Sequence, residues 1–131
     1  MIHFVSYLDT RKWRISVYVT ERCGEEGEII EALADMGCRG AELAGASNEL
    51  KKCGMNIGIT YSVGAMRNSI LVLGLQDSRA EFVNTMRHEQ HHVISHICKS
   101  DGIDMNTEEA AYIDGEVGEG IYIGLKKSDL L

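Results

Sequence analysis

The segment that decides the fold covers residues 78–99 and reads SRAEFVNTMRHEQHHVISHICK. It begins with Ser78 and Glu81, spaced as in a capping box, in which each side chain bonds a free backbone amide at the start of a helix. On a projection of 100° per residue, six apolar side chains fall in one stripe about 120° wide. These are Phe82, Val83, Met86, Val93, Ile94 and Ile97. The pattern predicts a helix from Ser78 to about Lys99 that packs this stripe on a hydrophobic core.

Another face of the same helix carries His88, Glu89 and His92, which form the motif H-E-x-x-H. Histidines four residues apart lie one turn apart on one face, so both imidazoles reach a single ion, and zinc prefers such ligands. Glu89 is displaced by about 100° around the helix, which suits a general base beside a metal-bound water. The alternative is a pair of ordinary surface histidines. His91 lies on the opposite side and is expected to be solvated.

The third metal ligand is expected from the next helix. His96 continues the histidine series, but it lies about 12 Å along the axis from His88, so a supporting or structural role is expected for it. Glu108 and Glu109 begin a helix that can fold back toward the histidines. With Asn106 as the N-cap, Glu109 occupies the capping-box position and Glu108 stays free. Glu108 is therefore the expected ligand and Glu109 the reserve, while the alternative for Glu108 is a carboxylate that stabilises the helix N-terminus.

Three further segments have the pattern of β-strands. Residues 13–20 alternate apolar and polar side chains and are rich in β-branched and aromatic types. Residues 55–63 and 69–75 are strand-like runs, separated by a connection of hairpin length. Together they predict an α+β fold with a small, mostly antiparallel three-stranded sheet packed against the helix of residues 78–99.

Other helices are expected around this sheet. Apolar residues at helical spacing predict two short helices over residues 28–36 and 40–52, the second closed by residues 53–54. A final helix is expected over about residues 107–119, followed by a short apolar piece at residues 121–125. No linker divides the chain, so residues 1–131 are expected to form one domain.

Composition excludes several classes of protein. The 131 residues include 13 Lys+Arg and 20 Asp+Glu, and the net charge of −7 repels the phosphates of nucleic acids and anionic lipids. The longest apolar runs, such as residues 70–73, are far too short to span a bilayer, and no secretory leader is recognisable, so a soluble cytoplasmic protein is expected. The four cysteines lack C-x-x-C spacing, which excludes a cysteine zinc finger and favours buried free thiols.

Two motifs together point to a known family. The sequence HEQHH at residues 88–92, followed by EEAAY at residues 108–112, resembles the gluzincin-type zinc metallopeptidases, whose second helix carries E-x-x-A-[D/N/Y]. The small single-domain phage-type or bacterial members are the most similar, and the similarity covers roughly residues 55–119. The resemblance implies a minimal zincin-like domain that hydrolyses peptide bonds.

The resemblance also implies roles for particular residues. Zinc is expected on His88, His92 and Glu108, and Glu89 is expected to take a proton from the water and pass it to the leaving amine. This interpretation depends on the two imidazoles and Glu108 reaching one ion. Tyr112 stands where the family often has an Asp that supports a ligand histidine. Its phenol is expected to donate a hydrogen bond to a ligand or to the substrate, and the alternative is a packing residue.

The implied substrate is an extended peptide or protein segment. The strand before the helix, over residues 69–75, is implied to form a sheet edge along which the peptide pairs. Tyr112, Tyr61 and His96 are candidates for the donor that stabilises the oxyanion. The rival interpretation is a non-catalytic zincin-like binding or regulatory module, with structural or absent zinc. A third is an interaction domain with surface histidines and no metal.

Overall fold

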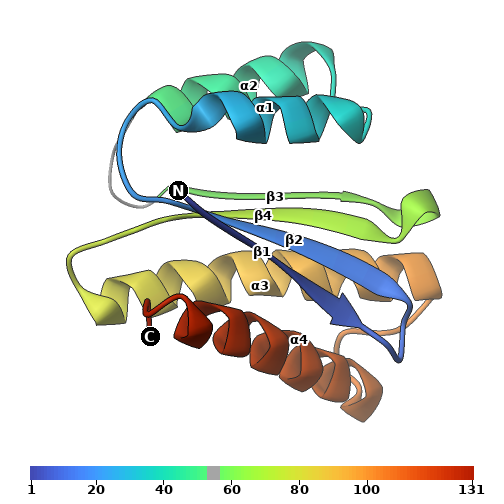
Figure 1. Ribbon diagram of the computed structural model, residues 1–131. Coiled ribbons are helices and arrows are strands. Elements are labelled where there is room, and N and C mark those ends of the chain that lie inside the picture. Colours follow the sequence, from blue (N-terminus) through green and yellow to red (C-terminus); the bar gives the residue numbers. More distant parts are fainter. Residues whose placement is uncertain (53–56) are drawn as a thin grey trace.

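In the computed structural model, which describes residues 1–52 and 57–131, a four-stranded sheet forms the middle of three layers (Figure 1). The strands are β1 (Ile2–Leu8), β2 (Trp13–Thr20), β3 (Gly58–Val63) and β4 (Asn68–Gly74), and their order is β1-β2-β4-β3. The outer pairs, β1 with β2 and β3 with β4, are antiparallel. The central pair, β2 with β4, is parallel, so the sheet is mixed.

The β4 strand lies inside the sheet, and the prediction that residues 69–75 form an edge is wrong. Residues 70–73 are at most 2% exposed, because Leu71 and Leu73 pack on one face and Ile70 and Val72 on the other. A continuous apolar run is typical of a strand that is buried on both faces. The open edges are therefore β1 and β3.

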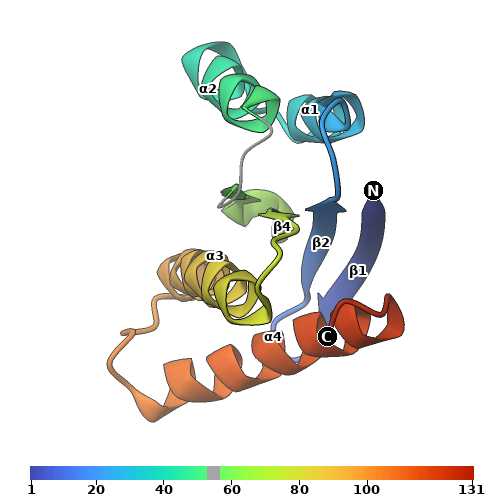
Figure 2. The same cartoon turned by 90° about the vertical axis from the view of Figure 1, so that its left-hand side faces the viewer.

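Helices cover both faces of the sheet (Figure 2). On one side lie α1 (Glu26–Asp35) and α2 (Gly40–Lys51), whose buried residues include Ile29, Leu33 and Leu50. On the other side lie α3 (Arg79–Asp101) and α4 (Glu108–Lys127), which run in opposite directions. Of these two helices, α3 contacts β3 and β4, and α4 contacts β1. The edge strand β3 therefore lies between α2 above it and α3 below it.

The helix predicted from Ser78 is confirmed as α3. The Ser78 side chain accepts a hydrogen bond from the Glu81 amide at 3.3 Å, and Gly102 ends the helix in the left-handed conformation at φ 67°. The helix runs two residues beyond Lys99. Its buried side chains include the predicted apolar residues Phe82, Met86, Val93, Ile94 and Ile97.

The last helix is longer than predicted. The α4 helix continues to Lys127, so the end expected near residue 119 is wrong, because Ile121 and Leu125 extend the buried stripe of the helix. Gly124 allows a close approach to β1, since a Cβ there would overlap the Phe4 ring. The N-cap is Thr107 rather than Asn106, and the Thr107 hydroxyl accepts a hydrogen bond from the Ala110 amide at 3.3 Å.

The α+β class is confirmed. The predicted number of three strands is wrong, although two of the three strand pairs are antiparallel, as expected of a mostly antiparallel sheet. The β1 strand was not predicted, and the β2–β4 pair is parallel. The predicted segments at residues 13–20, 28–36 and 40–52 correspond to β2, α1 and α2. The predicted helix end at residues 53–54 and the first two residues of the strand predicted over 55–63 lie outside the described residues.

Two of the cysteines agree with the prediction of buried free thiols. Cys38 and Cys98 are free and buried. Cys23 is disulfide-bonded, so the prediction is wrong for this residue, because spacing along the chain does not report which cysteines meet in space. Cys53 lies outside the described residues. Across residues 1–52 and 57–131, no helix is both long enough and apolar enough to cross a membrane.

Candidate metal centre

The middle of α3 gathers three groups that can hold a metal ion. His88, Glu89 and His92 each offer one ligand atom, and these atoms all lie within 4.8 Å of one another. The two imidazole Nε2 atoms are 3.3 Å apart, and Glu89 Oε2 is 3.8 Å from His88 Nε2. The predicted pairing of the two histidines on one helical face is thus observed.

The distance between the imidazoles fits one tetrahedral ion. Zinc binds imidazole nitrogen at about 2.0 to 2.1 Å, and two such ligands at the tetrahedral angle have nitrogens about 3.3 to 3.4 Å apart. The His88 and His92 Nε2 atoms have this separation, and their rings are close to perpendicular, at 78°. The pair could therefore hold one metal ion with little change in the separation of the two nitrogens.

Glu89 is held between α3 and β3. Glu89 is 6% exposed. The Thr60 hydroxyl can donate to two oxygens of Glu89, the side-chain Oε1 at 3.0 Å and the backbone oxygen at 3.2 Å. Gly58 provides the space, because a Cβ at that position would come within 2.7 to 2.9 Å of the Glu89 side chain. The second oxygen, Oε2, is nearest to His88. The side chain of His88 is 68% exposed, so the group opens to solvent.

A groove runs along β3 and reaches this group. It is lined by Glu42 and Ala46 of α2, by Thr60 and Tyr61 of β3, and by Glu89, His92 and His96 of α3. A second hollow reaches the same carboxylate from the other side, between Gly58, Asn84, Thr85 and His88. Glu89 is therefore accessible from both hollows, although most of its surface is buried.

His96 lines the groove and does not belong to the metal-binding group. Its Nδ1 atom lies 2.6 Å from the Ser62 hydroxyl, and the ring is half-buried. Burial lowers the pKa of His96, and the nearby His92 and Lys99 act in the same direction. The neutral imidazole is thus favoured in the groove.

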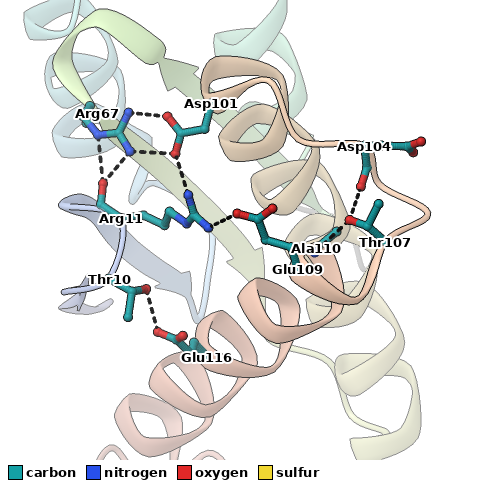
Figure 3. A network of polar contacts seen from close by, with 9 residues as sticks. All are labelled: Thr10, Arg11, Arg67, Asp101, Asp104, Thr107, Glu109, Ala110 and Glu116. Atoms are coloured by element: carbon teal, nitrogen blue, oxygen red, sulfur yellow. Dashed lines mark hydrogen bonds and ion pairs between the residues drawn. The ribbon is translucent and has the colours of Figure 1, made fainter.

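Glu108 is not brought to the histidines. It is exposed at the start of α4, and it is not a member of the group that His88 and His92 form. The start of α4 lies near the C-terminal end of α3, as the contacts of the neighbouring Glu109 show (Figure 3). Arg11 Nη2 donates to Glu109 Oε1 at 2.6 Å, and Arg11 Nη1 lies 3.7 Å from Asp101. Asp101 is nine residues beyond His92, or about 13 Å along the helix. Neither Glu108 nor the reserve, Glu109, is placed to share the ion.

Of the two tyrosines considered as candidates, Tyr112 lies away from the groove and Tyr61 lines it. Tyr112 is 67% exposed on α4 and is not among the residues that line the groove or the second hollow. The structure therefore does not bring it to the predicted catalytic group. Tyr61 does line the groove, and burial raises the pKa of its phenol.

Sequence reasoning missed the residues of β3 that position the site. Gly58, Thr60 and Ser62 alternate with Ile59 and Tyr61 along the strand, so the three small residues share one face, the face that contacts α3. A run of small and polar residues at every second position was the available signal. It marks a strand face that accommodates polar side chains from a neighbouring element.

The arrangement combines two imidazoles that suit one zinc ion with a carboxylate that can accept a proton beside them. It lies on a rigid helix, and the groove gives a ligand access to it. Comparisons of the chain with protein-family models, curated proteins and solved structures find no match.

Proposed function

We propose that the chain is a zinc-dependent hydrolase that cleaves peptide bonds, with His88 and His92 as zinc ligands and Glu89 as the general base. The observation that carries the proposal is the 3.3 Å separation of the two Nε2 atoms beside a buried carboxylate. A bound zinc ion supplies a water of lowered pKa and polarises a carbonyl oxygen.

Glu89 has the geometry for proton transfer. Thr60 engages Oε1, which leaves Oε2 on the side of the histidines. From there Oε2 accepts a proton from the attacking water and passes it to the nitrogen of the leaving amine. The fixed carboxylate needs no rearrangement between the two transfers.

The condition that Glu108 shares the ion with the two imidazoles is not met, so the proposal does not rest on the family resemblance but on the group of His88, Glu89 and His92 alone. The residues that the structure describes contribute two histidines and at most one carboxylate to the ion. Catalytic zinc sites hold the ion with three protein ligands and leave the fourth position to water, so two histidines leave one more position open than that pattern has. Two protein ligands also hold zinc less tightly than three, so the metal should be removed readily by a chelator.

The open edge of β3 offers a binding site for an extended substrate. A peptide that pairs with this edge lies between α2 and α3, where the groove passes Glu89 and His92. Main-chain pairing gives affinity with little dependence on side chains. This places the substrate on β3, in contrast to the predicted strand of residues 69–75.

Glu89→Gln tests the proposal. Zinc-loaded wild-type and variant chains are incubated with a mixture of random-sequence peptides, and cleavage is followed by mass spectrometry alongside zinc content. The variant is expected to keep its zinc and to lose hydrolysis by at least about 100-fold, since general-base catalysis contributes about 10² to 10⁴. Absence of cleavage by the wild-type chain with bound zinc would overturn the proposal.

One observation favours a second function. Glu89 is itself within the metal-binding group, so its carboxylate is able to bind the ion instead of activating water. The chain would then be a non-catalytic metal-binding module. In that case Glu89→Gln loses zinc, whereas a general base can be replaced without loss of zinc.

A further inference from the structure

A chain of hydrogen bonds leads from the core to His96. Trp13 Nε1 donates to Ser69 Oγ at 2.9 Å, Ser69 Oγ lies 2.7 Å from Ser62 Oγ, and Ser62 Oγ lies 2.6 Å from His96 Nδ1. The two serines face each other across β4 and β3, in register. This series of hydrogen bonds thus links the buried indole of Trp13 to the imidazole of His96 in the groove.

The direction of these hydrogen bonds follows from the first donor. An indole N–H only donates, so Ser69 Oγ accepts from Trp13 and keeps its own hydrogen for another partner. Ser69 is 0% exposed, and its other partner within the described residues is Ser62. If Ser62 donated to Ser69, the Ser69 hydrogen would be buried without an acceptor, which is costly. Ser69 therefore donates to Ser62, and the Ser62 hydroxyl keeps its own hydrogen, with His96 Nδ1 2.6 Å away as an acceptor.

The direction of the last hydrogen bond decides the tautomer of His96. When Nδ1 accepts from Ser62, the proton of the neutral ring is on Nε2. Nε2 has no hydrogen-bond partner within the described residues, and it is not one of the buried atoms left without a partner, so it contacts solvent in the groove. An N–H donor is thus presented on the wall that also carries His92.

We propose that His96 Nε2–H donates a hydrogen bond to the oxygen of the carbonyl under attack, and that Trp13, Ser69 and Ser62 hold His96 in this tautomer. The proposal rests on the proposed function. His96 lies one turn beyond His92, about 6 Å along the axis, so an oxygen bound between the histidines and the groove is within reach of the ring. Such donors act at about 2.7 to 3.1 Å from the developing oxyanion.

The tautomer can be measured without metal. Long-range proton–nitrogen spectra of the ¹⁵N-labelled full chain should show His96 protonated on Nε2 and unprotonated on Nδ1. Ser62→Ala removes the hydroxyl next to His96 from the series of hydrogen bonds and should give a mixture of the two His96 tautomers. A wild-type His96 protonated on Nδ1 would overturn the proposal even if the variant failed to fold.

The donor role is measured with methylphosphonate, a tetrahedral anion, as the probe for the zinc-loaded chain. His96→Asn can still accept from Ser62 but does not reach the Nε2 position, so its affinity should fall about tenfold or more. His96→Gln places an amide N–H near that position and should stay within about threefold of wild type. His91→Asn, exposed on the same helix, is the matched control and should bind as wild type does.

Equal affinity of His96→Asn and wild type, at equal zinc content, would show that His96 does not donate to the anion. A wild-type chain that takes up no zinc would overturn the donor role together with the proposed function. The tautomer would then stand as a separate result. Failure of the donor alone is recognised by normal zinc content and normal cleavage in His96→Asn.

Discussion

The α3 helix carries charged and titratable groups in two different settings. At its C-terminal end, Asp101 accepts two hydrogen bonds from Arg67, at 2.8 and 2.9 Å, and lies beside Arg11 (Figure 3). Arg67 also donates to the Arg11 carbonyl, and its guanidinium lies over the Trp13 ring at 5.0 Å. In the middle of the helix, His88, Glu89 and His92 face one another, and the described residues place no Lys or Arg salt bridge there.

The difference separates groups that stabilise the fold from groups that could hold a metal ion. Oppositely charged groups connect α3 to the β1–β2 loop and to the turn before β4, and Arg11 extends the connection to α4. Two imidazoles and a carboxylate held within 4.8 Å of one another are expected to gain further stability when a cation joins them. Substitutions in the two regions should therefore have opposite effects on the free energy of unfolding of the metal-free chain.

The largest change in the free energy of unfolding is expected at the C-terminal end of α3, where Asp101 pairs with Arg67. Arg67→Met should lower the free energy of unfolding by about 3 kcal/mol, because it removes at once the partly exposed ion pair with Asp101, the hydrogen bonds to the Arg11 carbonyl and the contact with the Trp13 ring. Urea denaturation measures the change. Arg87→Met, at an exposed arginine, is the control and should stay within about 0.5 kcal/mol of wild type. A loss of zinc affinity in Arg67→Met, with the fold intact, would contradict the separation of the two regions.

The next effect is stabilisation by metal. Zinc at 100 times its dissociation constant should raise the free energy of unfolding by about 2.7 kcal/mol. His92→Ala should abolish this increase, whereas His91→Ala should retain it, and thermal denaturation with and without zinc distinguishes them. An equal response of both variants would place the ion elsewhere.

A smaller effect of opposite sign is expected from Glu89→Gln in the metal-free chain. The substitution removes a charge that is 6% exposed and keeps an oxygen that accepts from Thr60. Stability should rise by about 1 kcal/mol, as expected where a binding group is held at a cost to the fold. Urea denaturation in the presence of a chelator provides the measurement. A decrease would mean that the carboxylate stabilises the fold.

The smallest effect concerns pH. The hydrogen bonds from Arg67 hold the pKa of Asp101 below its ordinary value of 3.8. The stability that this carboxylate contributes is therefore fully present above pH 3.8 and is lost as the pH falls through the lowered pKa. Acid denaturation should show this loss in the wild type, and Arg67→Met should lack it. An identical pH dependence of both chains would remove Asp101 as its cause.

Local patterns predicted the helix that carries the site. Ser78 and the apolar stripe identified α3, and the four-residue spacing identified the pairing of His88 with His92. These features depend only on the geometry of one helix. The same holds for β2, α1 and α2, whose periodicity is visible in the sequence.

Features that depend on how distant elements meet were not predicted. The capping rule assigned Asn106 instead of Thr107, and it gave no information about where α4 would start relative to α3. The end of α4 was expected near residue 119, although Gly124 packs the continuing helix on Phe4. The position of Glu108, and the support that Thr60 gives to Glu89, follow from tertiary packing alone.

The parallel pairing of β2 with β4 has a consequence for the order of folding. The contact that orients Glu89, from Thr60, joins residues 29 apart within the contiguous β3–β4–α3 segment. The β2–β4 pairing instead joins Arg14 to Asn68, across both α1 and α2. Closing the larger loop is entropically less favourable and slower. We expect pulse-labelled hydrogen exchange to protect α3 and β3 before β2, so that the half of the molecule that carries His88, Glu89 and His92 folds before the β2–β4 pairing completes the sheet.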